Sequence, residues 1–198
     1  MPASIAEEII KVGRIMFERR LADIAGGNIS QRDGDQLYIT PTGAGQKYLW
    51  DLDPDHIIRS PVATDDLLEH PQHSKESISH LLVYRAYPQV QAIIHAHPFH
   101  IMPFCAAEVP IPALIKSAQI YADSFGFIAE LPMYSRQQGE DIVARLKPHA
   151  ETMGRMAAAL LMPQHGIFIA AASLYKALDC LERMDTNAYC ALAQNWIQ

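Results

Sequence analysis

Three histidines in two distant segments have the residue type and spacing of a metal site. His95 and His97 follow the apolar run Val90–Ile94 and are separated by one residue. In a strand, residues i and i+2 point to the same face, so both imidazoles leave the sheet together. Neutral imidazoles bind Zn²⁺ and other borderline cations. The pair alone is a weak signal, because such spacings also occur by chance.

A third histidine, His165, lies between two apolar segments, where the chain must reverse its direction. Gly166 permits backbone angles there that other residues resist. A catalytic metal site with an open coordination position takes three protein ligands, so a remote third histidine fits such a site. His100 is a competitor, but its place on an expected helix directs it elsewhere. The other histidines are expected at the surface: His56, His70, His73, His80 and His149.

Glu76 follows Ser74 closely and opens an expected helix. A carboxylate at a helix N-terminus is favoured in its ionised form, as a base, although a glutamate there can also serve only the helix dipole. Two further motifs, Gly26-Gly27-Asn28 and Thr42-Gly43, offer backbone N–H groups and polar side chains to an anion. Taken alone, both motifs are explained more simply as turns.

The bulk properties indicate a globular chain with an ordinary core. Its 198 residues are 49% hydrophobic and 19% charged, which fits one domain over residues 1–198. The net charge of −6 and the absence of a basic stripe argue against a nucleic-acid partner. Three cysteines without a CxxC pair, Cys105, Cys180 and Cys190, predict free thiols in a reducing compartment. With no signal peptide and no membrane-spanning apolar run, we expect a cytoplasmic protein without membrane association.

Strands are expected in the middle of the chain, with helices around them. The predicted helices run from the cap Ser4 to Gly26-Gly27, and over 76–87, 98–107, 138–146 and 173–193. The predicted strands cover 36–40, 90–96, 157–162 and 166–171, with two more short strands within 51–64. This arrangement favours a single α/β or α+β domain.

Five short motifs occur in a characteristic order and spacing across nearly the whole chain. They are GGNIS at 26–30, ITPTG at 39–43, HSKE at 73–76, HAH at 95–97 and QHG at 164–166. Together they resemble the class II aldolase/adducin superfamily. The resemblance implies an α/β fold with a central, mostly antiparallel sheet flanked by helices. It also implies a homotetramer with active sites at subunit interfaces.

The resemblance also implies roles for individual residues. His95, His97 and His165 fall on the ligands of one divalent metal ion per subunit, usually zinc, with manganese, cobalt or magnesium as alternatives. Glu76 falls on the acid/base of the aldolases, which can be a fourth ligand when substrate is absent. The positions that hold a substrate phosphate correspond here to Gly27, Asn28, Thr42, Gly43 and Ser74.

Two departures from the family pattern concern the substrate. Lys75 stands where the family often has a second serine, and it could hold phosphate as a point charge or pair with a carboxylate. Lys116 stands at the ungapped position of a tyrosine with which family aldolases protonate the aldehyde oxygen, and Tyr121 is nearby. Lys116 and Tyr121 are therefore candidate substrate contacts. We expect related chemistry on a different small molecule.

The implied reaction is retro-aldol cleavage of a keto-sugar phosphate or a related hydroxy-keto acid through a metal-stabilised enediolate, with Glu76 moving the proton. Decarboxylation of a β-keto acid uses the same logic and is the nearest alternative, with Lys75 and Lys116 as carboxylate contacts. Epimerase relatives carry Asp where this chain has Glu76, which favours an aldolase. A non-catalytic scaffold like the adducin heads, which lack the metal-binding set, is the remaining alternative.

Overall fold

One seven-stranded sheet organises the protein, in the order β3-β2-β1-β4-β7-β6-β5. The computed structural model describes residues 4–121 and 126–197. Its strands are β1 (Asn28–Asp33), β2 (Gln36–Ile39), β3 (Ile58–Pro61), β4 (Ala92–Ala96), β5 (Gly126–Phe127), β6 (Ala157–Met162) and β7 (Gly166–Ala171). Neighbouring strands pair antiparallel except β5 with β6. The expected central, mostly antiparallel sheet flanked by helices is confirmed.

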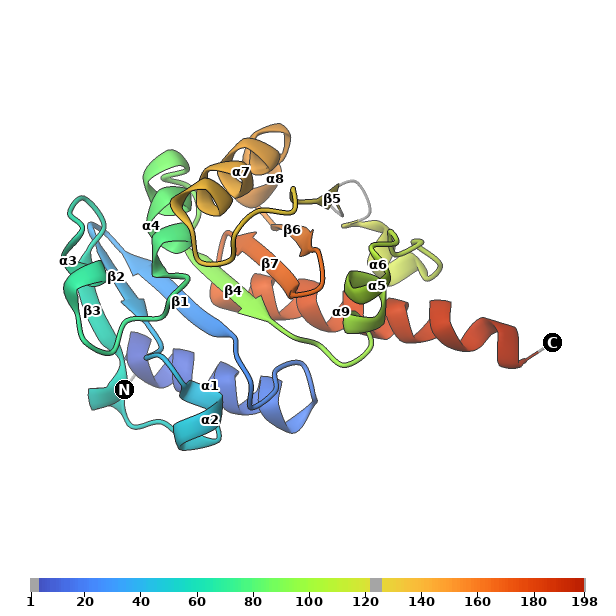
Figure 1. Ribbon diagram of the computed structural model, residues 1–198, viewed down its shortest axis with the longest axis horizontal. Helices are drawn as coiled ribbons and strands as arrows, with labels where there is room; N and C mark the ends of the chain where they lie inside the picture. Colours follow the sequence, from blue (N-terminus) through green and yellow to red (C-terminus); the bar gives the residue numbers. More distant parts are fainter. Residues whose placement is uncertain (1–3, 122–125, 198) are drawn as a thin grey trace.

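Helices cover both faces of the sheet (Figure 1). The long helices α1 (Ile5–Glu18) and α9 (Leu174–Ala193) lie on one face. The other face is covered by α4 (Ser77–Ala86), α7 (Arg136–Leu146) and α8 (Ala150–Met153). The shorter helices are α2 (Ala44–Tyr48), α3 (Asp66–Glu69), α5 (Met102–Ala107), α6 (Lys116–Gln119) and the 3₁₀ turns Pro54–His56, Lys147–His149 and Gln194–Trp196. Within the described part of the chain, no helix has the length and hydropathy needed to cross a membrane.

The alternation of side chains along β4 decides which residues face which helices. Ala92, Ile94 and Ala96 belong to the core under α1 and α9, whereas Ile93 belongs to the core under α4 and α7. His95 therefore points toward the α4 layer. Asn28 on β1 is its register partner, and directly opposed residues share a face of the sheet. The sheet thus presents an amide and an imidazole side by side to the start of α4.

Several sequence-based elements are confirmed. The capping box of Ser4 and Glu7 begins α1. The segments 157–162 and 166–171 pair as the β6–β7 hairpin in the predicted positions. Ser173 accepts a hydrogen bond from the Lys176 N–H and starts α9. These elements depend on local caps and on long apolar runs, which a sequence displays directly.

The predicted end of the first helix at Gly26-Gly27 is wrong, because α1 ends at Glu18. Arg20 takes a left-handed conformation with φ 59°, and the N–H of Leu21 donates to the Met16 carbonyl at 2.8 Å. This is the bonding pattern of a Schellman cap, in which glycine is the usual left-handed residue. Because arginine occupies that position, the sequence carries no glycine signal for the end of this helix.

The two strands expected within 51–64 are also a wrong prediction. Pro54–His56 is a 3₁₀ turn, and only β3 forms a strand among these residues. The Asp53 N–H donates to the His56 ring nitrogen at 3.0 Å, so it serves the turn and not a strand ladder. Pro54 has no backbone N–H, so it cannot donate a hydrogen bond to a neighbouring strand either.

The sequence interpretation missed β1, a strand near the middle of the sheet. Its residues after Ile29 are polar, yet Ser30 is fully buried and hydrogen-bonds to His80 at 2.7 Å and to Tyr84 at 2.9 Å. His80 was expected at the surface and is instead fully buried, with a pKa that burial lowers to about 3. Side chains from α4 thus provide hydrogen-bond partners for a buried polar residue of β1. The polar sequence of β1 gave no strand signal for this reason.

Trp50 joins α1 to the loop that precedes β1. Its indole is fully buried and donates to the Asp23 carbonyl at 2.9 Å. A Cβ at Gly13 would lie 2.9 Å from the indole, and one at Gly27 would lie 3.4 Å from it. Gly13 therefore leaves space that the indole occupies.

We expect Trp50→Ala to lower the free energy of unfolding by about 3–5 kcal/mol, because a large cavity replaces a buried aromatic side chain. Urea denaturation followed by circular dichroism measures this loss. Trp50→Phe keeps an aromatic ring in the core and should lower the free energy of unfolding clearly less than Trp50→Ala. Equal stability of Trp50→Ala and the wild type would contradict this account of the packing.

Candidate active site

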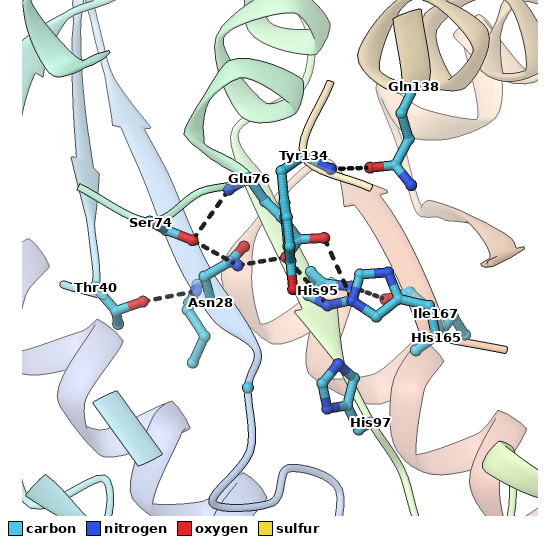
Figure 2. A network of polar contacts seen from close by, with 12 residues as sticks. Asn28, Thr40, Ser74, Glu76, His95, His97, Tyr134, Gln138, His165 and Ile167 are labelled. Carbon is cyan, nitrogen blue, oxygen red and sulfur yellow. Dashed lines mark hydrogen bonds and ion pairs between the residues drawn. The ribbon is translucent and has the colours of Figure 1, made fainter. Parts of the chain in front are cut away.

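Three imidazoles from distant parts of the chain converge at the end of β4 (Figure 2). His95 lies on β4, His97 directly follows that strand, and His165 lies in the turn between β6 and β7. Their ring centroids are 4.7 to 5.3 Å apart, and one nitrogen of each ring lies within 4.8 Å of the others. This spacing suits three nitrogen ligands around a single divalent cation.

Hydrogen bonds orient two of these rings. The Nδ1–H of His95 donates to the Ile167 carbonyl at 3.0 Å, which leaves its Nε2 for the site. Nδ1 of His97 lies 3.2 Å from the Asp23 carboxylate. Carboxylates and carbonyls behind metal-binding histidines characteristically fix the ring orientation in this way.

The cluster has the chemistry of a cation site. Burial lowers the pKa of His165 to about 4 and that of His95 well below its usual value, so both imidazoles are in the neutral, ligating form. Nε2 of His97 and Nδ1 of His165 are buried without a hydrogen-bond partner among the described residues. Unpartnered buried nitrogens are costly unless another group uses them. The residues therefore fit a divalent metal ion.

The Glu76 carboxyl lies against the cluster, at the N-cap of α4. Its side chain is buried, accepts a hydrogen bond from the Asn28 amide at 2.7 Å and lies 3.1 Å from Nε2 of His95. Burial raises the pKa of Glu76 to about 7, against the lowering effect of the Asn28 hydrogen bond. Burial therefore opposes the ionisation that we expected at the helix N-terminus.

The predicted anion-binding loops border the same cleft, of about 240 Å³. Its lining includes the predicted set Gly27, Asn28, Thr42, Gly43, Ser74 and Lys75, together with Glu76 and the histidine cluster. The Asn28 amide also donates to the Ser74 hydroxyl at 3.0 Å, which ties two of these segments together. Gly27 and Gly43 have φ of 104° and 73°, conformations that favour glycine.

Two candidate substrate contacts lie elsewhere in this chain. Neither Lys116 nor Tyr121 lines the cleft. The Tyr121 hydroxyl donates to Asp179 on α9 at 2.7 Å. His100 also points elsewhere, as predicted, because its Nδ1 lies 2.7 Å from the Asp185 carboxylate.

Three residues of the site were missed from the sequence. Lys47 and Tyr134 line the cleft, and Asp23 contacts His97. Tyr134 directly precedes Ser135, the N-cap of α7, and its ring meets His165 edge-on at 6.0 Å. These positions carry no motif: Lys47 lies on the short helix α2, and Asp23 and Tyr134 reach the site through the path of a loop. Only Asp23 offered a signal in the sequence, because it lies three residues before Gly26 of the predicted anion-binding motif.

The sequence of this chain is similar to known proteins over most of its length. The sequence model of the Class II Aldolase and Adducin N-terminal domain matches residues 7–192. The L-fuculose phosphate aldolase of Methanocaldococcus jannaschii is 25% identical over 182 residues, 92% of each chain. The 3-oxo-tetronate 4-phosphate decarboxylase of Escherichia coli is 29% identical over 193 residues, 93% of this chain and 84% of that protein.

Solved structures share the fold. An L-fuculose 1-phosphate aldolase superposes with a TM-score of 0.79 at 23% identity, over 100% of this chain and 90% of that one. The l-fuculose-1-phosphate aldolase of Thermus thermophilus gives a TM-score of 0.78 at 22% identity, over 95% and 93%. The five motifs, the sheet and the match of the sequence model to residues 7–192 lead to one conclusion. The chain belongs to the class II aldolase and adducin N-terminal domain family.

Proposed function

We propose that the protein is a metal-dependent aldolase that reversibly cleaves a keto-sugar phosphate or a related hydroxy-keto acid. The observation that carries this proposal is the buried Glu76 carboxyl, 3.1 Å from Nε2 of His95 beside two further imidazoles. A carboxyl with a pKa of about 7 can take and return a proton at neutral pH. Relatives named L-fuculose phosphate aldolase support the reaction class.

His95, His97 and His165 would hold one divalent cation. Three imidazoles favour Zn²⁺, with Co²⁺ and Mn²⁺ as alternatives, over Mg²⁺, which prefers oxygen ligands. Bound there, the ion supplies Lewis-acid stabilisation of the negative charge that develops on substrate oxygen. Glu76 can serve as a fourth ligand in the absence of substrate.

Glu76 would move the proton at the carbon of the ketone fragment. In cleavage, the carboxyl gives its proton to the carbon that the broken bond leaves behind; in condensation, the carboxylate removes it. The Asn28 amide keeps the carboxyl beside His95, since it donates to one carboxyl oxygen at 2.7 Å. Glu76 is almost completely buried, so few water molecules contact the carboxyl while the proton moves between it and the substrate carbon.

The loop segments would bind the anionic end of a small substrate. Gly27, Asn28, Thr42, Gly43 and Ser74 supply N–H and hydroxyl groups along one side of the cleft. Lys47 and Lys75 add two positive charges to the same cleft. This arrangement suits a phosphate or a carboxylate.

Decarboxylation of a β-keto acid is the second candidate. The specific observation in its favour is the presence of two lysines in one cleft, because a substrate with both a carboxylate and a phosphate would engage each of them. Relatives named 3-oxo-tetronate 4-phosphate decarboxylase support it. Epimerase activity and a non-catalytic, adducin-like role rank lower, because the site combines a glutamate with a complete histidine cluster.

We further propose a cytoplasmic homotetramer of single-domain subunits, residues 1–198, with active sites at subunit interfaces. An apolar cavity of about 950 Å³ shares His97 with the cleft and is lined by Phe99, Tyr189 and Trp196, all strongly exposed. The C-terminal end of α9 extends away from the sheet (Figure 1). It carries Tyr189 of this lining. Exposed apolar patches of this kind characteristically mark protein interfaces.

Glu76→Gln tests the acid/base role. We expect turnover to fall by about 10²- to 10⁴-fold, because the amide cannot carry the proton. The assay is a screen of keto-sugar phosphates, hydroxy-keto acids and β-keto acids, with and without phosphate, using zinc-loaded protein. Metal content should stay near the wild-type value, and Glu69→Gln on the exposed end of α3 is the matched control.

The screen also decides between the candidates. Aldehyde formation supports the aldolase, and release of carbon dioxide alone supports the decarboxylase. Cleavage of non-phosphorylated acids only would reject the phosphate assignment. Near-normal turnover of Glu76→Gln would reject the acid/base role, and a protein that takes up no divalent cation would reject metal-dependent catalysis.

Asp23→Ala tests the support behind His97. We expect the variant to bind Co²⁺ about 10- to 100-fold more weakly, because the imidazole loses the carboxylate that orients it. Asp23→Asn keeps an acceptor oxygen, so its affinity for Co²⁺ should lie between those of Asp23→Ala and the wild type. Asp33→Asn, an exposed aspartate at the end of β1, is the control. Titration by visible absorption measures the dissociation constants, and unchanged affinity of Asp23→Ala would refute the role of this contact.

Trp196→Glu tests the proposed assembly. We expect light scattering to report four subunits for the wild type and fewer for the variant, because a charge replaces an apolar contact. Tyr175→Glu changes an exposed aromatic residue of α9 that lies outside the apolar cavity, and it should keep the tetramer. A monomeric wild type would rule the assembly out.

A further inference from the structure

Tyr134 stands at the mouth of the cleft, across Glu76 from the anion-binding loops. Figure 2 shows its ring reaching from the segment before α7 toward the Glu76 carboxyl and the histidine cluster. The side chain is 41% exposed, so the residue can meet both a substrate and solvent. No part of the proposed function above uses this phenol.

The backbone holds Tyr134 in an unusual conformation. Its φ is 65°, in the left-handed region that bulky residues rarely adopt. The Tyr134 N–H donates to the Gln138 side chain at 3.2 Å, and Gln138 is a buried residue of α7. Such conformations persist where surrounding contacts enforce them, and they are concentrated at functional sites.

The ring is held by residues of the cleft on two sides. The Lys75 ammonium lies 5.3 Å from its centroid, and the His165 ring meets it edge-on at 6.0 Å with an interplanar angle of 89°. One contact comes from the segment before α4 and the other from the β6–β7 turn. These contacts fix the plane of the ring and leave its hydroxyl group to the cleft.

The hydroxyl of Tyr134 has no hydrogen-bond partner among residues 4–121 and 126–197. Buried tyrosines of this protein differ: the hydroxyls of Tyr84 and Tyr87 contact Ser30 and the Val143 carbonyl at 2.9 and 2.6 Å. A well-placed donor without a protein acceptor is available to a substrate oxygen.

We propose that Tyr134 is a second catalytic residue, the acid that protonates the aldehyde oxygen of the substrate. This inference rests on the proposed aldolase function. Glu76 lies deep in the cleft beside His95 and serves the carbon of the ketone fragment, so the oxygen of the other fragment needs a different donor. Lys116 and Tyr121 do not line the cleft, whereas Tyr134 does.

The proton balance of the condensation is complete with these two residues. Glu76 takes a proton from the ketone carbon, and the electron pair of that C–H bond forms the new C–C bond with the aldehyde carbon. The π pair of the aldehyde moves to its oxygen, which takes the hydroxyl proton of Tyr134. Solvent returns a proton to the exposed phenolate and removes one from Glu76. Cleavage follows the same steps in reverse.

Tyr134→Phe separates the two proton transfers. Exchange of the ketone C–H with deuterated water needs Glu76 but no aldehyde, whereas condensation needs both residues. The probes are dihydroxyacetone phosphate or pyruvate alone for exchange, and the same ketone with glycolaldehyde for condensation. We expect the variant to exchange within about twofold of the wild type and to condense about 100-fold more slowly or worse.

The controls make the outcomes distinct. Phenylalanine keeps the ring between Lys75 and His165, so bound zinc should remain unchanged, and Tyr175→Phe on α9 should behave as the wild type. Condensation by Tyr134→Phe within roughly fivefold of the wild-type rate, or a parallel loss of exchange, would overturn the catalytic role of Tyr134 alone. A wild type that performs neither exchange nor condensation would overturn the proposed function, and the inference with it.

Discussion

The site depends on one buried hydrogen bond, from the Asn28 amide to the Glu76 carboxyl. It joins the start of β1 to the start of α4, and the register of β1 with β4 places Asn28 directly opposite His95. The same amide holds Ser74, so a single side chain sets the spacing between an anion-binding loop, the carboxyl and the histidine cluster. Since these groups are removed from water, a displaced partner would leave a buried polar group unsatisfied, and the arrangement is therefore strongly specified.

The contact between β1 and α4 continues beyond the site as a line of polar pairs. Glu76, His80 and Tyr84 follow each other at intervals of four residues on one side of α4, where they meet Asn28 and then Ser30 on the same face of β1. Buried polar groups of this kind contribute little net stability but discriminate against other packings. A one-residue slip of β1 would turn Asn28 and Ser30 toward the apolar core under α1 and α9.

The two sides of the cleft have different physical characters. On the inner side, neutral imidazoles and a carboxyl are fixed by buried contacts from β1, β4 and the β6–β7 turn, which suits chemistry that requires little motion. On the outer side, Lys47, Lys75 and Tyr134 come from loops and short helices and remain accessible. Relatives of this chain are named both as aldolases and as a decarboxylase. A fixed inner side and an accessible outer side are compatible with different activities on one fold.

The sequence by itself determined the elements whose signals are local. Caps and apolar runs predicted the β6–β7 hairpin, α9 and the strand that ends in His95, and the five motifs led to the family and to the residues of the cleft. Tertiary structure alone decided the existence of β1, the burial of His80, the raised pKa of Glu76, the places of Asp23 and Tyr134, and the distance of Lys116 and Tyr121 from the cleft. The physical reason is that the environment of a polar side chain is set by partners far away along the chain. Ser30 is tolerated in a buried strand because His80 and Tyr84 hydrogen-bond to it. The pKa of Glu76 is raised because the fold removes water from its carboxyl.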